Sequence, residues 1–137
     1  MTGPADSPNI EGLDRWAVDS RRVEKPWGWE LVWAEADAYV GKLLFVRAGE
    51  SLSLQYHERK DEAWLVQEGR ARLELGDVGG GLETIEIGRG DAFRYRPGTV
   101  HRVTALEDLL VVEVSTPELD DVVRLEDRYG RAGTSAP

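Results

Sequence analysis

The chain contains two histidines, His57 and His101, and both lie near residues that could bind a metal with them. Gln55 precedes His57 by two positions, and Glu62 follows it by five. Imidazole nitrogens and the oxygens of carboxylates and amides are donors that proteins use to hold divalent cations. These four residues are therefore candidates for metal chemistry if the fold brings them together.

Residues 55–62 have the pattern of two strands joined by a charged loop. In a strand, positions two apart point to the same face, so Gln55 and His57 project together. Every residue of 58–61 is charged, as suits a loop that turns the chain back, and Glu62 then opens the next strand. The carboxylate of Glu62 can therefore return to the face that His57 occupies.

His101 is expected on another strand, because residues 97–99 (Pro-Gly-Thr) form a tight turn just before it. Turn signals recur about every eight to twelve residues, which favours an all-β sandwich or barrel. Residues 109–114 are apolar on both faces apart from Glu113, so they are expected to form a central strand. The predicted strands cover residues 29–34, 39–47, 51–57, 63–67, 70–75, 83–87, 92–95, 99–104 and 109–115.

Length and composition favour one globular domain: the chain has 137 residues, of which 41% are hydrophobic and 31% charged. Residues 1–20 are expected to form a flexible arm, residues 21–131 the domain, and residues 132–137 a disordered tail. Within the domain, residues 118–130 are left as either a short helix or an extended segment packed on the sandwich.

The charge balance restricts the partners. A net charge of -9 argues against binding to nucleic acid, which depends on neutralising phosphates. A phosphorylated substrate would have to meet a local basic cluster, because the overall field repels it. The chain has no cysteine and shows neither a signal peptide nor an apolar run of about 18 residues, so we expect a cytoplasmic protein away from membranes.

Two glycine-framed segments resemble the signature motifs of the cupin superfamily. Residues 49–69 begin and end with glycine and hold the first three candidate ligands, with glutamine where the first histidine is usual. Residues 90–101 begin with glycine and end on the second histidine. The resemblance implies a jelly-roll fold, an antiparallel β-sandwich or double-stranded β-helix, that carries a metal site.

Within that superfamily, the chain is most similar to the cupin domain of type II mannose-6-phosphate isomerases. The likeness runs from about residue 23 to residue 131 and rests on KPWGWE (25–30), SLSLQYH (51–57), GTVHR (98–102) and DDVVRLEDRYGR (120–131). It implies interconversion of mannose 6-phosphate and fructose 6-phosphate, a sugar phosphate as the small-molecule partner, and a homodimer. In bifunctional relatives a guanylyltransferase domain precedes this one.

The resemblance implies four metal ligands: Gln55, His57, Glu62 and His101. This set fits Zn²⁺, Mn²⁺, Fe²⁺, Co²⁺ or Ni²⁺ and does not choose among them. A site of three ligands without Gln55 is an alternative, because a neutral amide binds metal weakly. The alternative for Glu62 is a surface ion pair with Lys60 or Arg59.

An isomerase would move a proton between C2 and C1 through an enediol, so a general base must reach C2. The candidates for that base are Glu62, Lys42 and a hydroxide on the metal. Arg102 matches the arginine of the family motif, although strand alternation turns it away from His101 unless the strand bulges. The other possible phosphate partners are Arg47, Arg94 and Arg96.

The chain departs from the family at residues 58 and 59, which are Glu and Arg where relatives carry further histidines. Two other functions therefore stay open. Two histidines and one carboxylate are also the ligand set of non-haem metal dioxygenases. A sugar-binding cupin without catalysis is the third reading.

Overall fold

The computed structural model describes residues 15–118 and 120–133. In that part of the chain all the regular structure is β-strand, so no helix there could span a membrane. The strands are β1 Arg21–Lys25, β2 Gly28–Glu35, β3 Val40–Val46, β4 Leu54–His57, β5 Glu62–Glu68, β6 Arg70–Asp77, β7 Leu82–Gly88, β8 Ala92–Tyr95, β9 Thr99–Ala105, β10 Leu109–Ser115 and β11 Val122–Glu126.

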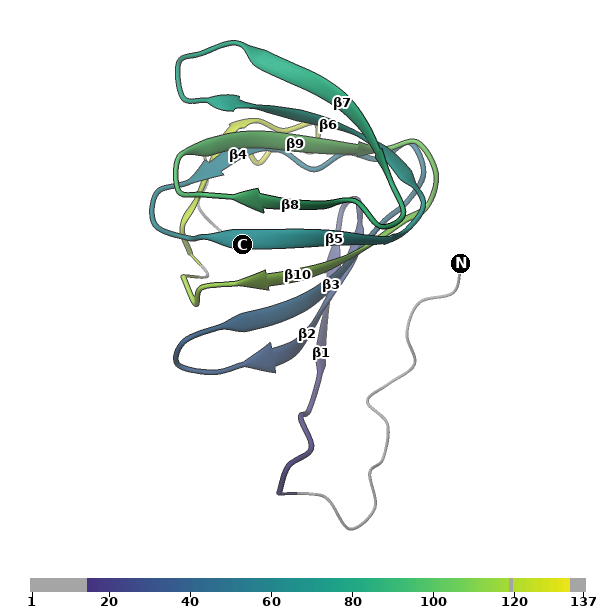
Figure 1. The fold of residues 1–137 in the computed structure, drawn as a ribbon, viewed down its shortest axis with the longest axis vertical. Helices are drawn as coiled ribbons and strands as arrows, with labels where there is room; N and C mark the ends of the chain where they lie inside the picture. The colour runs from purple at the N-terminus through teal and green to yellow at the C-terminus, as the bar shows by residue number, and fades with distance from the viewer. Residues whose placement is uncertain (1–14, 119, 134–137) are drawn as a thin grey trace.

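The strands form two antiparallel sheets that pack as a jelly-roll sandwich (Figure 1). One sheet has the order β1-β2-β3-β10-β5-β8, and the other has the order β11-β4-β9-β6-β7. The predicted all-β jelly-roll class is thus confirmed. As expected for residues 109–115, β10 lies inside its sheet, between β3 and β5.

The nine predicted strands all form, with ends that differ by a few residues. Two strands were not predicted as such. β1 begins directly after the expected arm, and most of that arm falls on residues 1–14, outside the described residues. β11 decides between the two readings of residues 118–130: the segment is extended and pairs with β4. The expected tail lies largely outside the described part of the chain.

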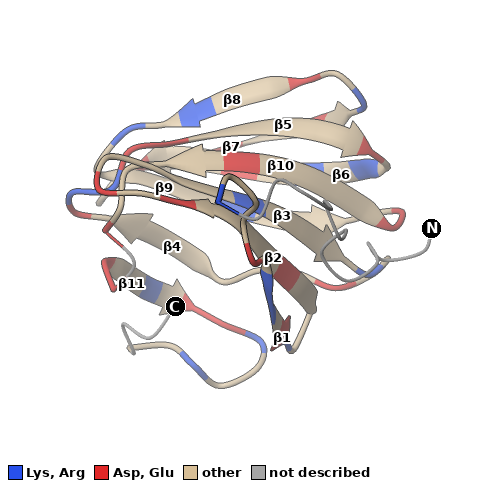
Figure 2. Ribbon diagram, turned by 90° about the horizontal axis from the view of Figure 1, so that it is seen from below, with Lys and Arg blue, Asp and Glu red and all other residues tan. Residues whose placement is uncertain are grey.

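The space between the sheets is apolar at one end and charged at the other. The hydrophobic core includes Trp64, Leu73, Val103, Leu109 and Val111, all at most 3% exposed. Charged residues occur within strands as well as in loops (Figure 2), and several of them are buried. Because a buried charge must be paired or bind an ion, the charged end is where a functional site is expected.

Candidate metal centre

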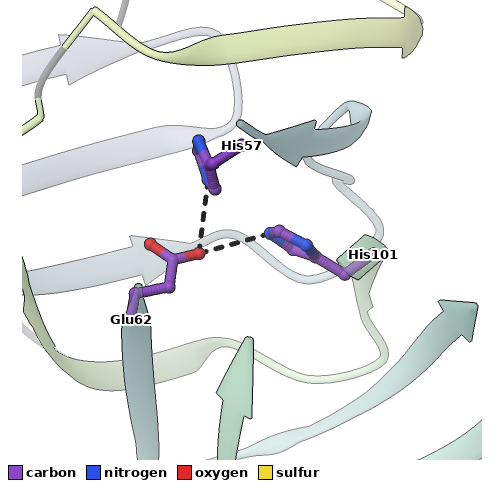
Figure 3. A group of neighbouring side chains, drawn as sticks. All are labelled: His57, Glu62 and His101. Carbon is purple, nitrogen blue, oxygen red and sulfur yellow. Dashed lines mark ion pairs between the residues drawn. The ribbon is translucent and has the colours of Figure 1, made fainter. Parts of the chain in front are cut away.

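Both histidines converge on one carboxylate between the sheets. His57 ends β4, Glu62 begins β5, and His101 lies in β9. Oε1 of Glu62 is 3.4 Å from Nε2 of His57 and 3.3 Å from Nε2 of His101 (Figure 3). All three side chains are buried, and one donor atom from each lies within 4.8 Å of the others. Two strands of one sheet and one of the other therefore build a compact three-donor cluster.

The far nitrogen of each imidazole is held by the backbone. Nδ1 of His57 lies 2.8 Å from the carbonyl oxygen of Asp121, and Nδ1 of His101 lies 3.0 Å from that of Thr99. A carbonyl only accepts, so both rings donate through Nδ1, and Nε2 of each ring is directed at Glu62. Metal-binding histidines have this arrangement, in which the outer contact fixes tautomer and ring orientation. The donor set therefore fits a divalent metal.

Gln55 shares the site's face of its sheet. It pairs with His101 across β4 and β9, and its side chain lines the same pocket. On its other side, Gln55 pairs with Arg124 of β11. The structure thus brings three of the four sequence-derived metal ligands, Gln55, His57 and Glu62, to the lining of one pocket, and the fourth, His101, contacts Glu62 within the cluster.

A buried lysine forms an ion pair with the second carboxylate oxygen of Glu62. Lys60 is 7% exposed, and its Nζ lies 3.0 Å from Oε2 of Glu62 and 3.6 Å from Oε2 of Glu113. Nε1 of Trp64 donates to the other Glu113 oxygen at 2.9 Å. The pairing of Glu62 with Lys60 therefore exists, but it is buried and accompanies the histidine contacts.

Burial and charge set the pKa values in this cluster. Burial alone would raise the pKa of Glu62, but the two histidines and Lys60 hold it well below its ordinary range. Burial raises the pKa of Glu113 to about 7, and the charge of Glu62 adds to the rise. Burial opposes the charge of Lys60, but Glu113 and Glu62 raise its pKa above the usual value. Glu62 is therefore ionised and ready to bind a cation.

The loop between His57 and Glu62 is fastened by one carboxylate. Asp121 accepts backbone N–H bonds from Glu58 at 3.2 Å, Arg59 at 2.6 Å and Lys60 at 2.8 Å. Its own carbonyl is the acceptor for His57. The segment before β11 thus positions both the first histidine and the buried lysine.

Cationic side chains also line the wall of the pocket. Lys42 and Lys25 lie 3.0 and 3.6 Å from the two carboxylate oxygens of the buried Glu30. Arg124 and Arg131 complete this wall. Counting Lys60, five cationic and three anionic side chains (those of Glu30, Glu62 and Glu113) line the pocket, an excess of two positive charges in a chain of net charge -9.

Two of the three catalytic candidates face this pocket. Lys42 and Glu62 line it, but Arg102 lies on the outer surface of the other sheet, where Glu74 binds its guanidinium at 2.9 and 3.0 Å. Strand alternation holds there, so Arg102 points away from His101. The other candidate phosphate partners, Arg47, Arg94 and Arg96, are exposed and do not line the pocket either.

Sequence reasoning gave no functional role to six charged residues of the pocket: Lys25, Glu30, Lys60, Glu113, Arg124 and Arg131. All but Glu113 lie in segments that resemble the family. The signal that could have found four of them is the clustering of charged residues in segments 25–30 and 120–131, at both ends of the domain.

Comparison with curated proteins gives relatives that are named mannose-1-phosphate guanylyltransferases. The chain is 38% identical over 119 residues to the mannose-1-phosphate guanylyltransferase ManC of Salmonella typhimurium, and 37% identical over 115 residues to the mannose-1-phosphate guanylyltransferase of Escherichia coli K12. Each match covers 81% of this chain and 23% of the relative. The chain thus spans about a quarter of the length of these relatives.

Solved structures and a family match agree with the fold. KdgF from Halomonas sp. superposes with a TM-score of 0.62 at 27% identity, covering 73% of this chain and 88% of KdgF. A variant of the oxalate decarboxylase of B. subtilis gives a TM-score of 0.68 at 17% identity, covering 78% of this chain and 30% of that one. Residues 14–127 match the family described as mannose-6-phosphate isomerase C-terminal. The chain therefore belongs to this family of cupin domains.

Proposed function

We propose that the protein is a metal-dependent isomerase that interconverts mannose 6-phosphate and fructose 6-phosphate. The observation that supports this most strongly is that one pocket joins the His57–Glu62–His101 cluster to an excess of positive charge. The rest of the acidic chain repels anions, so a pocket of opposite sign is a specific feature. A ligand with a phosphate and several hydroxyl oxygens would match both parts.

The metal would be held by His57, Glu62 and His101, with Gln55 as a weaker fourth ligand. A divalent cation in such a site polarises substrate oxygens and stabilises negative charge that develops on them. The lysine at Oε2 of Glu62 keeps the carboxylate in one orientation, so that Oε1 stays directed between the two imidazoles. The histidines need no rearrangement to present Nε2.

The residues that move the proton belong to the same pocket. Isomerisation removes the proton from C2 of the aldose, forms an enediol, and returns a proton to C1 to give the ketose. We assign this transfer to Lys42, which would first pass a proton to its partner Glu30 at the pocket wall and then take the proton from C2 and return it to C1, with Glu62 as the alternative. Arg102 has no part in this proposal, because it is bound by Glu74 outside the pocket.

The phosphate would lie against the basic wall formed by Lys25, Arg124 and Arg131. Asp127 holds the guanidinium of Arg131 through two contacts of 3.0 Å, which orients it. Arginine and lysine side chains in a partly desolvated wall are suited to a phosphate dianion. The carbon chain would then extend from this wall towards the histidines.

The test is a coupled assay on metal-stripped protein, with mannose 6-phosphate and each of Zn²⁺, Mn²⁺, Fe²⁺, Co²⁺ and Ni²⁺ in turn. We expect fructose 6-phosphate to form only when metal is added. Glu62→Gln should abolish both metal binding and turnover, whereas Lys42→Gln should abolish turnover and keep the metal. Arg72→Gln, on the outer surface of the other sheet, is the matched control. If no fructose 6-phosphate forms with any of these metals, in protein shown to bind one of them, the proposal is overturned.

A metal-dependent dioxygenase is the second candidate, because two histidines and one carboxylate are also the ligands of such iron enzymes. The positive pocket would then take a small organic acid. Oxygen consumption that requires Fe²⁺ and such an acid would support this function. Saturable sugar phosphate binding without turnover would instead indicate a binding protein.

A further inference from the structure

The turn that follows β11 carries Arg131 to the pocket. β11 ends at Glu126, and the N–H of Gly130 then donates to the carbonyl oxygen of Asp127 at 3.3 Å. Gly130 has a φ of 80°, a backbone conformation that residues with a side chain rarely adopt. The chain therefore reverses between Tyr129 and Arg131. Arg131 lines the pocket, whereas the hydroxyl of Tyr129 binds residues 50 and 51.

Arg131 lies among like charges. It lines the pocket together with Lys25 and Arg124. Burial is the main cause that lowers the pKa of Lys25 and the pKa of Arg124, and the charge of Arg131 adds to the fall in both. The side chain of Arg131 is 23% exposed, so water is within its reach. Repulsion by two neighbouring cations would therefore drive this guanidinium towards solvent unless other contacts held it.

Two residues of the same turn hold the guanidinium in place. Asp127 accepts both of its side-chain N–H bonds at 3.0 Å and the backbone N–H of Arg131 at 2.7 Å. The carboxylate of Asp127 is fully buried, so water does not compete for it. The central carbon of the guanidinium also lies 5.7 Å from the centroid of the Tyr129 ring. Both contacts keep Arg131 at the pocket only while the turn itself stays in position.

The turn is fastened to residues 49–51 by side chains. The hydroxyl of Tyr129 donates to the carboxylate of Glu50 and accepts the N–H of Ser51 at 3.4 Å. Arg128 donates to the carbonyl oxygen of Gly49 at 2.8 Å. Burial raises the pKa of Tyr129, and the bond to Glu50 adds to the rise, so the hydroxyl keeps the proton that it donates. Residues 127–133 form no strand, so these contacts replace sheet pairing.

We propose that Tyr129 and Glu50 are positioning residues for the phosphate end of the pocket. Their contact, called the latch below, fixes the turn of residues 127–131 so that Arg131 is directed at the pocket before a ligand arrives. This inference rests on the proposed function, because it takes the anionic group of the ligand to lie against the basic wall.

The latch acts on affinity through preorganisation. A phosphate between Lys25, Arg124 and Arg131 replaces their mutual repulsion with attraction. Cations that are already fixed bind it more tightly, because no long side chain has to be ordered on binding. Neither residue of the latch lines the pocket, so its effect must pass through the turn. The latch should therefore favour a sugar that carries a phosphate over the same sugar without one.

The test is isothermal titration calorimetry of inorganic phosphate into the full chain, which requires no turnover. Tyr129→Phe removes the hydroxyl and keeps the ring, and Glu50→Ala removes its acceptor. Each should raise the Kd of phosphate about three- to tenfold. The KM for mannose 6-phosphate should rise by the same factor, with kcat unchanged. Tyr39→Phe is the matched control, since Tyr39 is 56% exposed and lies outside the pocket.

A double-mutant cycle distinguishes positioning of Arg131 from a general loss of stability. If the latch acts through Arg131, Tyr129→Phe should have no further effect on the Kd of phosphate once Arg131→Gln is present. An equal effect in both backgrounds would overturn the proposal. Wild-type affinity in folded Tyr129→Phe and Glu50→Ala would do the same. Circular dichroism and metal content show which variants are folded, and if one of the two fails to fold, the other decides.

The latch and the proposed reaction can fail separately. A chain that binds phosphate through the latch but forms no fructose 6-phosphate would refute the isomerase and keep the latch. Turnover together with an additive cycle would refute the latch and keep the isomerase. A wild-type chain that binds no inorganic phosphate up to about 10 mM would overturn the latch whatever the assay gives.

Discussion

Nζ of Lys60 lies 3.0 Å from Oε2 of Glu62, while Oε1 of the same carboxylate faces both histidines. One oxygen of this carboxylate is therefore held by the lysine, and the other is directed at the two imidazoles. The lysine is buried and also reaches Glu113, so it neutralises two acids that would otherwise lie uncompensated in the interior. This relationship makes Lys60 a support of the metal centre.

Lys60→Met should be strongly destabilising, because it leaves Glu62 and Glu113 without their common cation. Breaking a buried ion pair by removing one partner costs about 3–5 kcal/mol. Urea unfolding of the metal-free protein measures the loss. Adding Glu113→Gln removes one of the stranded charges, so the double variant should recover part of the stability. Equal stability of Lys60→Met and wild type would show that the cluster is not coupled.

His57→Ala and His101→Ala should each reduce bound metal to background and leave the fold intact. Each removes one imidazole from the three-donor cluster, and neither position lies in the hydrophobic core cluster. Elemental analysis after dialysis against metal, beside circular dichroism, checks both claims. Full metal occupancy in the double variant would contradict the assignment of the site.

Sequence reasoning reached the fold and the residues of the three-donor cluster because both depend on local patterns. The two-residue spacing of Gln55 and His57 and the turn before His101 are visible in the chain itself. The alternation of buried and exposed residues also placed Arg102 on the opposite face from His101, as the structure has it. Local period and turn chemistry therefore decide these features.

The basic wall could not be predicted in the same way, because it depends on long-range pairing. Arg124 reaches the pocket only because β11 pairs with β4, where it lies opposite Gln55. Lys25 belongs to the other end of the domain in sequence, and the pairing of β1 with β2 places it at the pocket. Nothing in the spacing of these residues specifies that they share a cavity, so the exposed arginines Arg47, Arg94 and Arg96 were equally plausible from sequence.

Lys25→Gln and Arg131→Gln should weaken phosphate-bearing ligands and leave metal binding unchanged. A hydrogen bond to a charged group contributes about 1.5–3 kcal/mol, so each change should raise the KM for mannose 6-phosphate at least about tenfold. Steady-state kinetics and competition by inorganic phosphate provide the measurement. Arg72→Gln, which changes the same charge outside the pocket, is the control. Equal effects of all three variants would mean that only the overall charge matters.

Asp121→Ala should destabilise the protein near neutral pH and lose this effect in acid. Burial alone would raise the pKa of Asp121, but the three backbone N–H groups of residues 58–60 hold it below its ordinary 3.8. A lowered pKa stabilises the fold above the ordinary value, and the contribution disappears as pH falls through the folded value. Urea unfolding at about pH 7 should therefore show a loss of about 1.5–3 kcal/mol that shrinks below about pH 4. The exposed neighbour gives the control Asp120→Ala, and a loss independent of pH would contradict the role of the charge.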